Sequence, residues 1–105
     1  MKWPRIEPDA VRDMENAVAY FELQGLKQKA AFAKSLREAL SLIATSARRH
    51  ARLETNNTDR EIRRVVIQRF RYLVIFEMVS ETPRVLSVMH ASQEPNSWQR
   101  QDSSD

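Results

Sequence analysis

The chain has 105 residues, of which 42% are hydrophobic and 30% are charged, a balance that predicts one globular domain and excludes a disordered or collagen-like chain. It has no cysteine and one glycine, which excludes a disulfide scaffold, a cysteine-ligated metal site and a glycine-rich phosphate loop. The formal net charge is +3, and no apolar run approaches the ~20 residues that cross a bilayer, so we expect a cytoplasmic protein without membrane contact.

The N-terminal part of the chain predicts a short strand followed by a helix. Residues 1–7 are mixed in character and can form a short edge strand, and Pro8-Asp9 then opens a helix that we expect over residues 9–24. Its apolar residues recur at intervals of three and four, at Val11, Met14, Val18 and Phe21. Gly25 follows at the place where a helix C-cap is expected.

A second amphipathic helix is expected over residues 26–47. Its apolar stripe consists of Phe32, Leu36, Leu40, Ile43 and Ala47, with Ala39 beside it. Two helices joined by a glycine-containing turn predict an αα-hairpin, and we interpret both apolar stripes as core packing.

The rest of the chain changes to strand character after a polar loop at residues 52–60. We expect three strands, at residues 61–68, 71–78 and 84–90. Only Arg69 and Phe70 remain for the first turn, which predicts a tight hairpin, and residues 80–83 form the second turn.

This order of elements predicts an α+β fold, in which an N-terminal αα-hairpin packs on a mainly antiparallel sheet of three to four strands. We expect a single domain over residues 1–100 and a flexible polar tail over residues 101–105.

Positive charge is concentrated in one part of the chain. Between Arg48 and Arg71 there are eight arginines and three carboxylates, a local net charge of +5. Arginine forms bidentate contacts with phosphate and carboxylate groups, so this window predicts a surface for an anionic partner, either nucleic acid or an acidic protein segment. The alternative is a solvated basic loop and strand face. Strand alternation places Arg69 and Arg71 on the same side of the sheet.

Few residues are suited to catalysis or metal binding. His50 and His90 are forty residues apart in a chain without cysteine, so we expect no metal, no cofactor and no small-molecule ligand. His90 ends the last strand, where it can act as an acid or base or simply bond a backbone carbonyl. Trp98, in the loop beyond, either covers the edge of the core or anchors a partner.

Several short motifs together resemble a known family. They are Arg60-Glu61-Ile62, the run from Arg69 to Phe76, the run from Arg84 to His90, and Pro95 followed by Trp98. With the αα-hairpin before them, they resemble the toxins of the RelE/ParE superfamily, which belong to type II toxin–antitoxin systems and stabilise plasmids. The resemblance covers roughly residues 9–100.

The resemblance implies one of two modes of growth arrest. RelE-like members cut mRNA on the ribosome with arginines and often a histidine or tyrosine, whereas ParE-like members inhibit DNA gyrase. This chain has Leu73 and Gln93 where the nucleases commonly have arginines, and Trp98 near the place of their tyrosine. The resemblance therefore implies a ParE-like toxin that binds DNA gyrase and is neutralised by a cognate antitoxin.

Two alternatives remain open: a ribosome-dependent mRNA endonuclease, and an inactive toxin homologue. As a nuclease the chain would use His90 as acid or base, with Arg64, Arg69 and Arg71 contacting phosphate. As a binding protein it would contact its target or antitoxin through Arg63, Arg64, Arg69, Arg71, Tyr72, His90 and Trp98.

Overall fold

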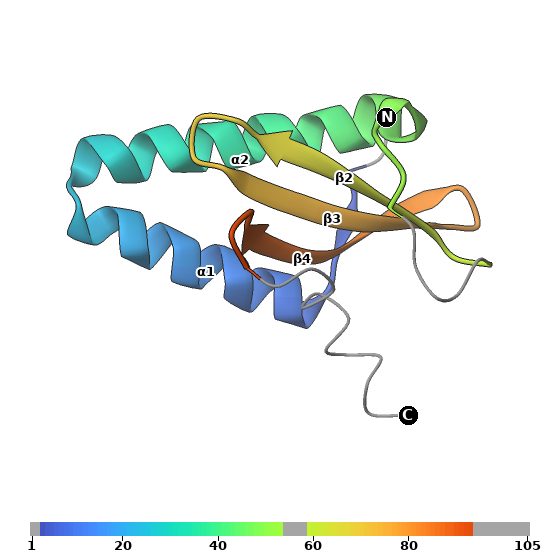
Figure 1. Cartoon of the computed structure of the whole chain (residues 1–105), viewed down its shortest axis with the longest axis horizontal. Coiled ribbons are helices and arrows are strands. Elements are labelled where there is room, and N and C mark those ends of the chain that lie inside the picture. The colour runs from blue at the N-terminus through green and yellow to red at the C-terminus, as the bar shows by residue number, and fades with distance from the viewer. Residues whose placement is uncertain (1–2, 54–58, 94–105) are drawn as a thin grey trace.

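A computed structural model describes residues 3–53 and 59–93 of the chain. Its elements are β1 (Arg5–Ile6), α1 (Pro8–Leu23), α2 (Leu26–Ser46), the 3-10 helix η1 (Ala47–Arg49), β2 (Glu61–Ile67), β3 (Tyr72–Val79) and β4 (Thr82–His90). The strands form one sheet in the order β1-β4-β3-β2, in which β1 runs parallel to β4 and the other neighbours are antiparallel. Both helices cover one face of this sheet (Figure 1). The predicted α+β arrangement of an αα-hairpin on a mainly antiparallel sheet is confirmed.

Helix α1 packs Met14, Val18 and Phe21 of the predicted stripe against the core, but not Val11. Its buried residues are Ala10, Ala17 and Phe21, whereas Val11 is 41% exposed. The prediction that Val11 belongs to the core stripe was therefore wrong. Small alanine side chains allow α1 to pack closely across β4, and they carry less weight in a hydrophobicity pattern than valine does.

Helix α2 buries the predicted stripe and packs across β2. Its buried residues are Phe32, Leu36, Ala39, Leu40 and Ile43. Gly25 lies between the two helices with a φ of 126° and a ψ of 155°, a conformation that favours glycine over any residue with a Cβ. This residue therefore allows the chain to reverse between α1 and α2.

The turn between β2 and β3 is longer than predicted. The backbone N–H of Phe70 donates to Ile67 O (3.3 Å) and that of Arg71 to Gln68 O (3.3 Å), so the turn covers residues 68–71. Arg71 has a φ of 59°. Both Arg69 and Arg71 lie in the turn, so the strand alternation that would place them on the same side of the sheet does not apply to them. A two-residue hairpin turn would need positive φ at Arg69, and in a type I′ turn also at Phe70, which neither residue favours.

The turn between β3 and β4 is shorter than predicted. Strand β4 already begins at Thr82, and only Ser80 and Glu81 connect the two strands. Both have positive φ, 49° and 67°, which is the pattern of a type I′ hairpin turn. Arg48 of η1 pairs with the Glu81 carboxylate (2.6 Å) and so joins this turn to the end of the helix hairpin.

A β-bulge interrupts β4 where it pairs with β3. Ile75 is opposite Ser87 whereas Phe76 is opposite Val85, so Leu86 is an extra residue of β4 with no partner in β3. Val85 and Val88 consequently both face the helices, and Leu86 lies in the apolar cluster on the other face of the sheet. The bulge shifts the alternation for the rest of β4.

Asp13 of α1 binds the bulge directly. One carboxylate oxygen accepts hydrogen bonds from Ser87 Oγ and from the backbone N–H of Val88, both at 2.9 Å. After the bulge, His90 lies directly opposite Tyr72 of β3. Tyr72 packs against the core on the helix side of the sheet, so His90 lies on that side too. Without the extra residue, alternation would put His90 on the opposite face of the sheet.

A second polar cluster holds the other end of the sheet. The Glu77 carboxylate lies between Arg60 (2.8 Å) and Arg84 (2.8 Å), and Arg84 also contacts Glu7 (3.2 Å). Hydrogen bonds from Arg60, and then from Arg84, lower the pKa of Glu77 below its ordinary value despite its burial. Folding therefore favours the ionised form of Glu77.

This pKa shift predicts a loss of stability in acid. A carboxylate with a depressed folded pKa stabilises the protein above its unfolded pKa, and that contribution disappears as the pH falls through the folded pKa. We expect Glu77→Gln to lower the free energy of unfolding by about 2 kcal/mol at neutral pH and to flatten its decline toward about pH 3. Urea denaturation of both proteins across this pH range measures the difference. Equal pH profiles would contradict this role of Glu77.

Candidate functional site

Much of the positive charge in the basic window is neutralised within the fold. Arg48 pairs with Glu61 (3.1 Å), and Arg60 pairs with Glu77. Arg63 pairs with Glu61 (2.9 Å) and donates to His50 O (2.7 Å), and its side chain is only 16% exposed. The structure therefore places Arg63, a predicted binding residue, in an internal contact rather than on an open surface.

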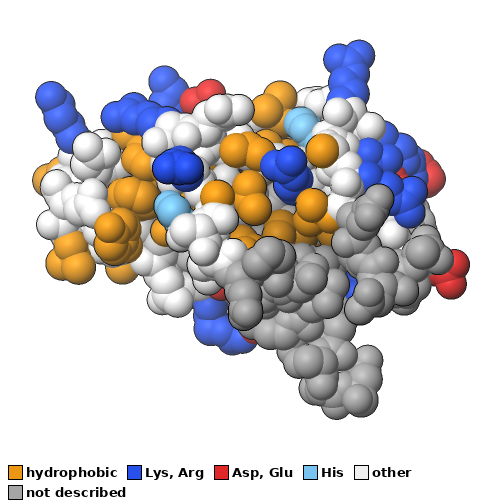
Figure 2. All heavy atoms as spheres, viewed as in Figure 1, with side chains coloured by type: hydrophobic (Ala, Val, Ile, Leu, Met, Phe, Trp, Pro, Cys, Tyr) orange, Lys and Arg blue, Asp and Glu red, His pale blue; other side chains and the backbone are white. Residues whose placement is uncertain are grey.

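Arg64 lies on the opposite face of β2 from the helices. It is partly exposed, and its side chain has no ion pair or hydrogen bond with the described residues. It is opposite Ile75 in the register, next to the pair of Val66 and Leu73. Figure 2 shows hydrophobic side chains interspersed with separate Lys or Arg side chains on the face viewed, while the visible carboxylates lie toward its margins.

The two arginines of the β2–β3 turn are exposed. The Arg69 guanidinium lies over the Phe70 ring, 5.1 Å from its centroid. The Arg71 carbonyl accepts a hydrogen bond from Ala91 N–H (2.7 Å), which attaches this turn to the end of β4. As a result the turn arginines lie at the same end of the molecule as His90.

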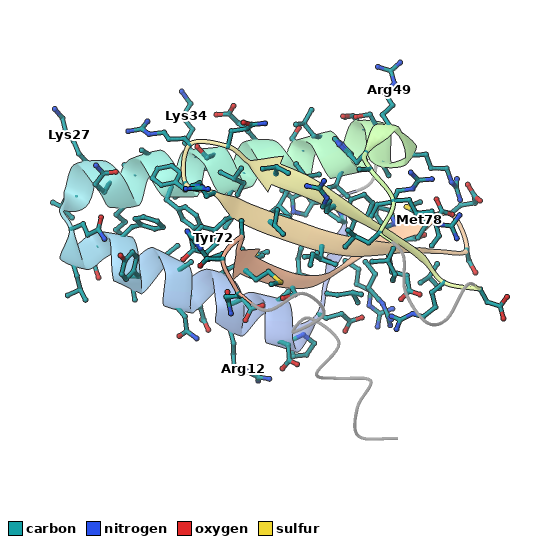
Figure 3. All side chains as sticks on the ribbon, viewed as in Figure 1. Arg12, Lys27, Lys34, Arg49, Tyr72 and Met78 are labelled. Atoms are coloured by element: carbon teal, nitrogen blue, oxygen red, sulfur yellow. The ribbon has the colours of Figure 1, made fainter. Side chains whose placement is uncertain are left out.

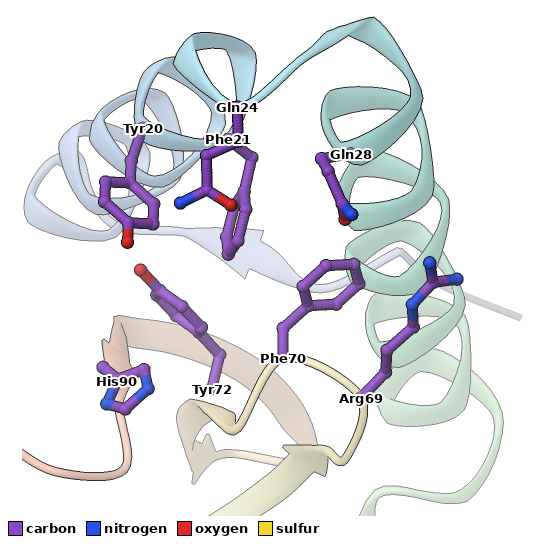
Figure 4. Close-up of a pocket in the computed structure, with 8 residues that line it drawn as sticks. All are labelled: Tyr20, Phe21, Gln24, Gln28, Arg69, Phe70, Tyr72 and His90. Atoms are coloured by element: carbon purple, nitrogen blue, oxygen red, sulfur yellow. The ribbon is translucent and has the colours of Figure 1, made fainter.

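A cavity of about 620 Å³ opens at this end, between the tip of the helix hairpin and the β2–β3 turn (Figure 4). We call it the hairpin pocket, and its lining residues are Tyr20, Phe21, Gln24, Gln28, Arg69, Phe70, Tyr72 and His90. Phe32 packs behind it, with its ring 4.7 Å from Phe21 and 5.1 Å from Tyr72 between centroids. Aromatic rings from both helices, the turn and β3 thus support the pocket.

Tyr72 has a central place in this pocket. Figure 3 shows its side chain between the sheet and the helix hairpin, and in Figure 4 its hydroxyl and that of Tyr20 point toward each other. Burial, and then the neighbouring Tyr20, raise the pKa of Tyr72 above its ordinary value. The phenol is therefore neutral at physiological pH and offers a hydroxyl rather than a charge.

His90 is held by hydrogen bonds at one nitrogen. Its Nδ1 accepts from the backbone N–H of Ser92 (3.0 Å) and lies 2.6 Å from Ser92 Oγ. A nitrogen that accepts a backbone N–H carries no proton, so the neutral ring is protonated at Nε2. The ring meets Tyr72 edge to face, 5.3 Å between centroids. His90, which lines the pocket, therefore has a hydrogen-bond donor at Nε2.

Gln93 has a role in fixing the end of β4. Its Oε1 accepts the backbone N–H of His90 (2.8 Å), and its own N–H donates to His90 O (3.0 Å). An arginine has no side-chain acceptor and cannot make the first of these bonds. Glutamine at this position closes the turn after β4, where the resemblance leads one to expect an arginine.

Leu73 is also engaged in packing. It faces away from the helices and packs against the second apolar cluster, which consists of Ile62, Ile75, Leu86 and Met89. All four cluster residues are at most 5% exposed. The position where the nucleases commonly have an arginine is thus part of an apolar face.

The structure brings some predicted site residues together and separates others. Arg69, Tyr72 and His90 line the hairpin pocket, and Arg71 lies in the adjoining turn, whereas Arg63 and Arg64 lie elsewhere on β2. Trp98 lies outside the described residues. Within the described residues, 3–53 and 59–93, no group of three or more His, Asp or Glu side chains is arranged to hold a metal ion. No helix in these ranges is long and apolar enough to span a membrane.

Sequence reasoning missed the helix side of the pocket. Tyr20, Gln24 and Gln28 follow one another at intervals of four residues, across the turn that contains Gly25. Tyr20 lies one helical turn before Gln24, and Gln24 and Gln28 lie on either side of Gly25, so all three are close to the hairpin tip. Their position beside the glycine turn was the available signal. The apolar stripes of both helices predict core packing and give no sign that neighbouring residues line a pocket.

The comparisons with known proteins agree with this arrangement. A family model described as the ParE toxin of a type II toxin–antitoxin system, parDE, matches residues 5–95. The match thus includes both helices and all four strands of the described sheet. No curated protein matches the chain significantly.

Proposed function

The chain belongs to the ParE toxin family of type II toxin–antitoxin systems, and on that basis we propose that it inhibits DNA gyrase by binding and that a cognate antitoxin neutralises it. In this proposal the protein acts through contact surfaces and carries out no hydrolysis. The contact residues are Tyr72, His90, the partly exposed Arg64 and the exposed turn arginines Arg69 and Arg71. Trp98 is a further contact that the family resemblance suggests.

The chemistry around His90 is the observation that supports binding over RNA cleavage. A general base needs a free ring nitrogen, but Nδ1 of His90 is occupied by Ser92 and Nε2 carries the proton. Leu73 and Gln93, at the two positions where a nuclease is expected to carry arginines, are engaged in packing and in a backbone hydrogen bond. The groups that would stabilise charge on a scissile phosphate are therefore replaced by structural side chains.

Neutralisation by an antitoxin is supported by the charge that remains exposed. Once Arg48, Arg60 and Arg63 are paired internally, the turn arginines Arg69 and Arg71 are left open beside an aromatic pocket. Antitoxin segments that order on binding are often acidic, and guanidinium groups bind carboxylates well. We therefore propose this end of the molecule as part of the antitoxin contact.

Pulse labelling after induced expression tests the target. We expect DNA synthesis to fall first while protein synthesis continues, and we expect the purified chain to inhibit supercoiling by gyrase in vitro. Co-expression of the antitoxin encoded beside the toxin gene is expected to restore growth. An early collapse of protein synthesis would replace the gyrase proposal with mRNA cleavage, and no effect on either process would indicate an inactive homologue.

Replacing His90 separates binding from cleavage more sharply. His90→Gln keeps an N–H donor but removes the imidazole that acid–base catalysis would need, so we expect gyrase inhibition within about threefold of the native protein. A nuclease that used His90 as acid or base would lose about 10²–10⁴-fold in cleavage. The half-inhibitory concentration in the supercoiling assay measures the effect, with the melting temperature of the variant as the control for folding.

A further inference from the structure

The hairpin pocket combines aromatic rings with polar side chains in its lining, and it is open to solvent. Phe21 and Phe70 are in edge-to-face contact at 4.9 Å, and the Tyr20 ring meets Phe21 at 5.1 Å. Tyr20 is itself 54% exposed although it lines the cavity. A rigid aromatic recess of this kind is suited to receive an apolar side chain.

The tip of the helix hairpin extends this apolar surface. Leu23 and Leu26 lie on either side of Gly25 and are 89% and 75% exposed. Neither packs against the sheet, so the fold does not require leucine at these positions. Exposed leucines next to an aromatic recess indicate a surface that a protein partner covers, because burying them favours association.

The polar groups of the pocket all suit an acidic partner. Arg69 and the Nε2–H of His90 are donors, Gln24 and Gln28 offer both donors and acceptors, and none of the lining residues that the structure describes is a carboxylate. Arg71 adds a second exposed cation in the adjoining turn. The exposed leucines argue against nucleic acid, because its phosphate backbone gains nothing from covering apolar side chains.

We propose that the hairpin pocket is an anchor site for the antitoxin, which inserts one apolar side chain between Tyr20, Phe70 and Tyr72 and places a neighbouring carboxylate on Arg69. Gln24, just after α1, and Gln28 of α2 bind the polar backbone of the same segment at the rim. This inference rests on the proposed neutralisation by an antitoxin and adds to it a defined pocket, an acidic and apolar ligand segment and the residues that select it.

Filling the pocket tests this proposal. The measurement is the affinity of the full chain for the antitoxin encoded beside the toxin gene, by isothermal titration calorimetry. We expect Gln28→Trp to weaken binding at least about 30-fold, because the indole occupies the space of the anchor side chain. Ala30→Trp is the matched control: it adds the same indole to α2 at an exposed residue two positions on, which points away from Gln28, and should cost less than about threefold.

A charge reversal tests the carboxylate contact separately. Arg69→Glu is expected to weaken antitoxin binding about tenfold and to reduce its salt dependence. Lys34→Glu makes the same change in net charge on a side chain that projects outward from α2 (Figure 3), and should have a much smaller effect. Gln24→Trp, at the C-cap of α1, repeats the blocking test from the other side of the hairpin turn.

The outcomes distinguish this proposal from the one on which it rests. Native-like binding by the folded Gln24→Trp and Gln28→Trp variants would overturn the anchor site, while binding by the native chain would leave neutralisation intact. An equal loss in Ala30→Trp would also overturn the anchor site, because the effect would not be specific to the pocket. If the native chain did not bind the antitoxin, both proposals would fail.

Discussion

Phe32→Ala is expected to lower the free energy of unfolding by about 3–5 kcal/mol, the largest effect we predict for a single residue. Phe32 is fully buried on α2 and contacts the rings of Phe21, Phe70 and Tyr72. Removing its ring leaves a cavity at the junction of both helices, the β2–β3 turn and β3. Thermal and urea unfolding measure the loss.

The same substitution should also impair antitoxin binding, because Phe32 supports the pocket walls from behind. Phe32→Leu is the matched control, since leucine fills much of the space and is expected to cost only about 1–2 kcal/mol. Two results would contradict this role: a loss below about 1 kcal/mol in Phe32→Ala, or equal losses in the alanine and leucine variants.

Asp13→Ala is expected to cost about 2–3 kcal/mol, because it removes a charged acceptor from two hydrogen bonds at the bulge of β4. Ser87 is fully buried, so its hydroxyl and the Val88 N–H would each lose a strong partner. The bulge in turn sets the face on which His90 lies. We therefore expect weaker antitoxin binding along with the lower stability.

Asp13→Asn is the control for this prediction. An asparagine oxygen can still accept both hydrogen bonds, so this variant should lose only about 1 kcal/mol. The midpoints of urea unfolding measure the difference in stability between the two variants, provided that the slope of the free energy of unfolding against urea concentration is the same for both. If alanine and asparagine cost the same, the hydrogen bonds to Ser87 and Val88 are not what Asp13 contributes.

The helices and strands were predictable because their patterns are local. A stripe such as the one from Phe32 to Ile43 has the period of a helix, and the β-branched runs after residue 60 have strand character. The turns were harder, since both use non-glycine residues at positive φ, at Arg71 and at Ser80 and Glu81. These conformations are stabilised by the paired strands on either side and leave no signature in composition.

The candidate site was predictable only in part. The strand sequence and the family resemblance pointed to Tyr72 and His90, but the face on which His90 lies depends on one extra residue in β4. A bulge of this kind follows from tertiary contacts such as those of Asp13, which is 74 residues away from Ser87 in the chain. The pairing of Arg63 with Glu61 was likewise hidden, because charge alone does not show which arginines fold inward.

The outer edge of the sheet has a consequence for solubility. Residues 51–53 pair with only the first part of β2, through Arg64 N–H to Ala51 O and Leu53 N–H to Ile62 O. Past Arg64, no strand among the described residues pairs with the outer side of β2 at Val66, and such an edge invites pairing between copies. Arg64, Arg69 and Arg71 surround this stretch with like charges that repel a second copy. Substituting them to study binding should therefore also make the free chain more prone to aggregate.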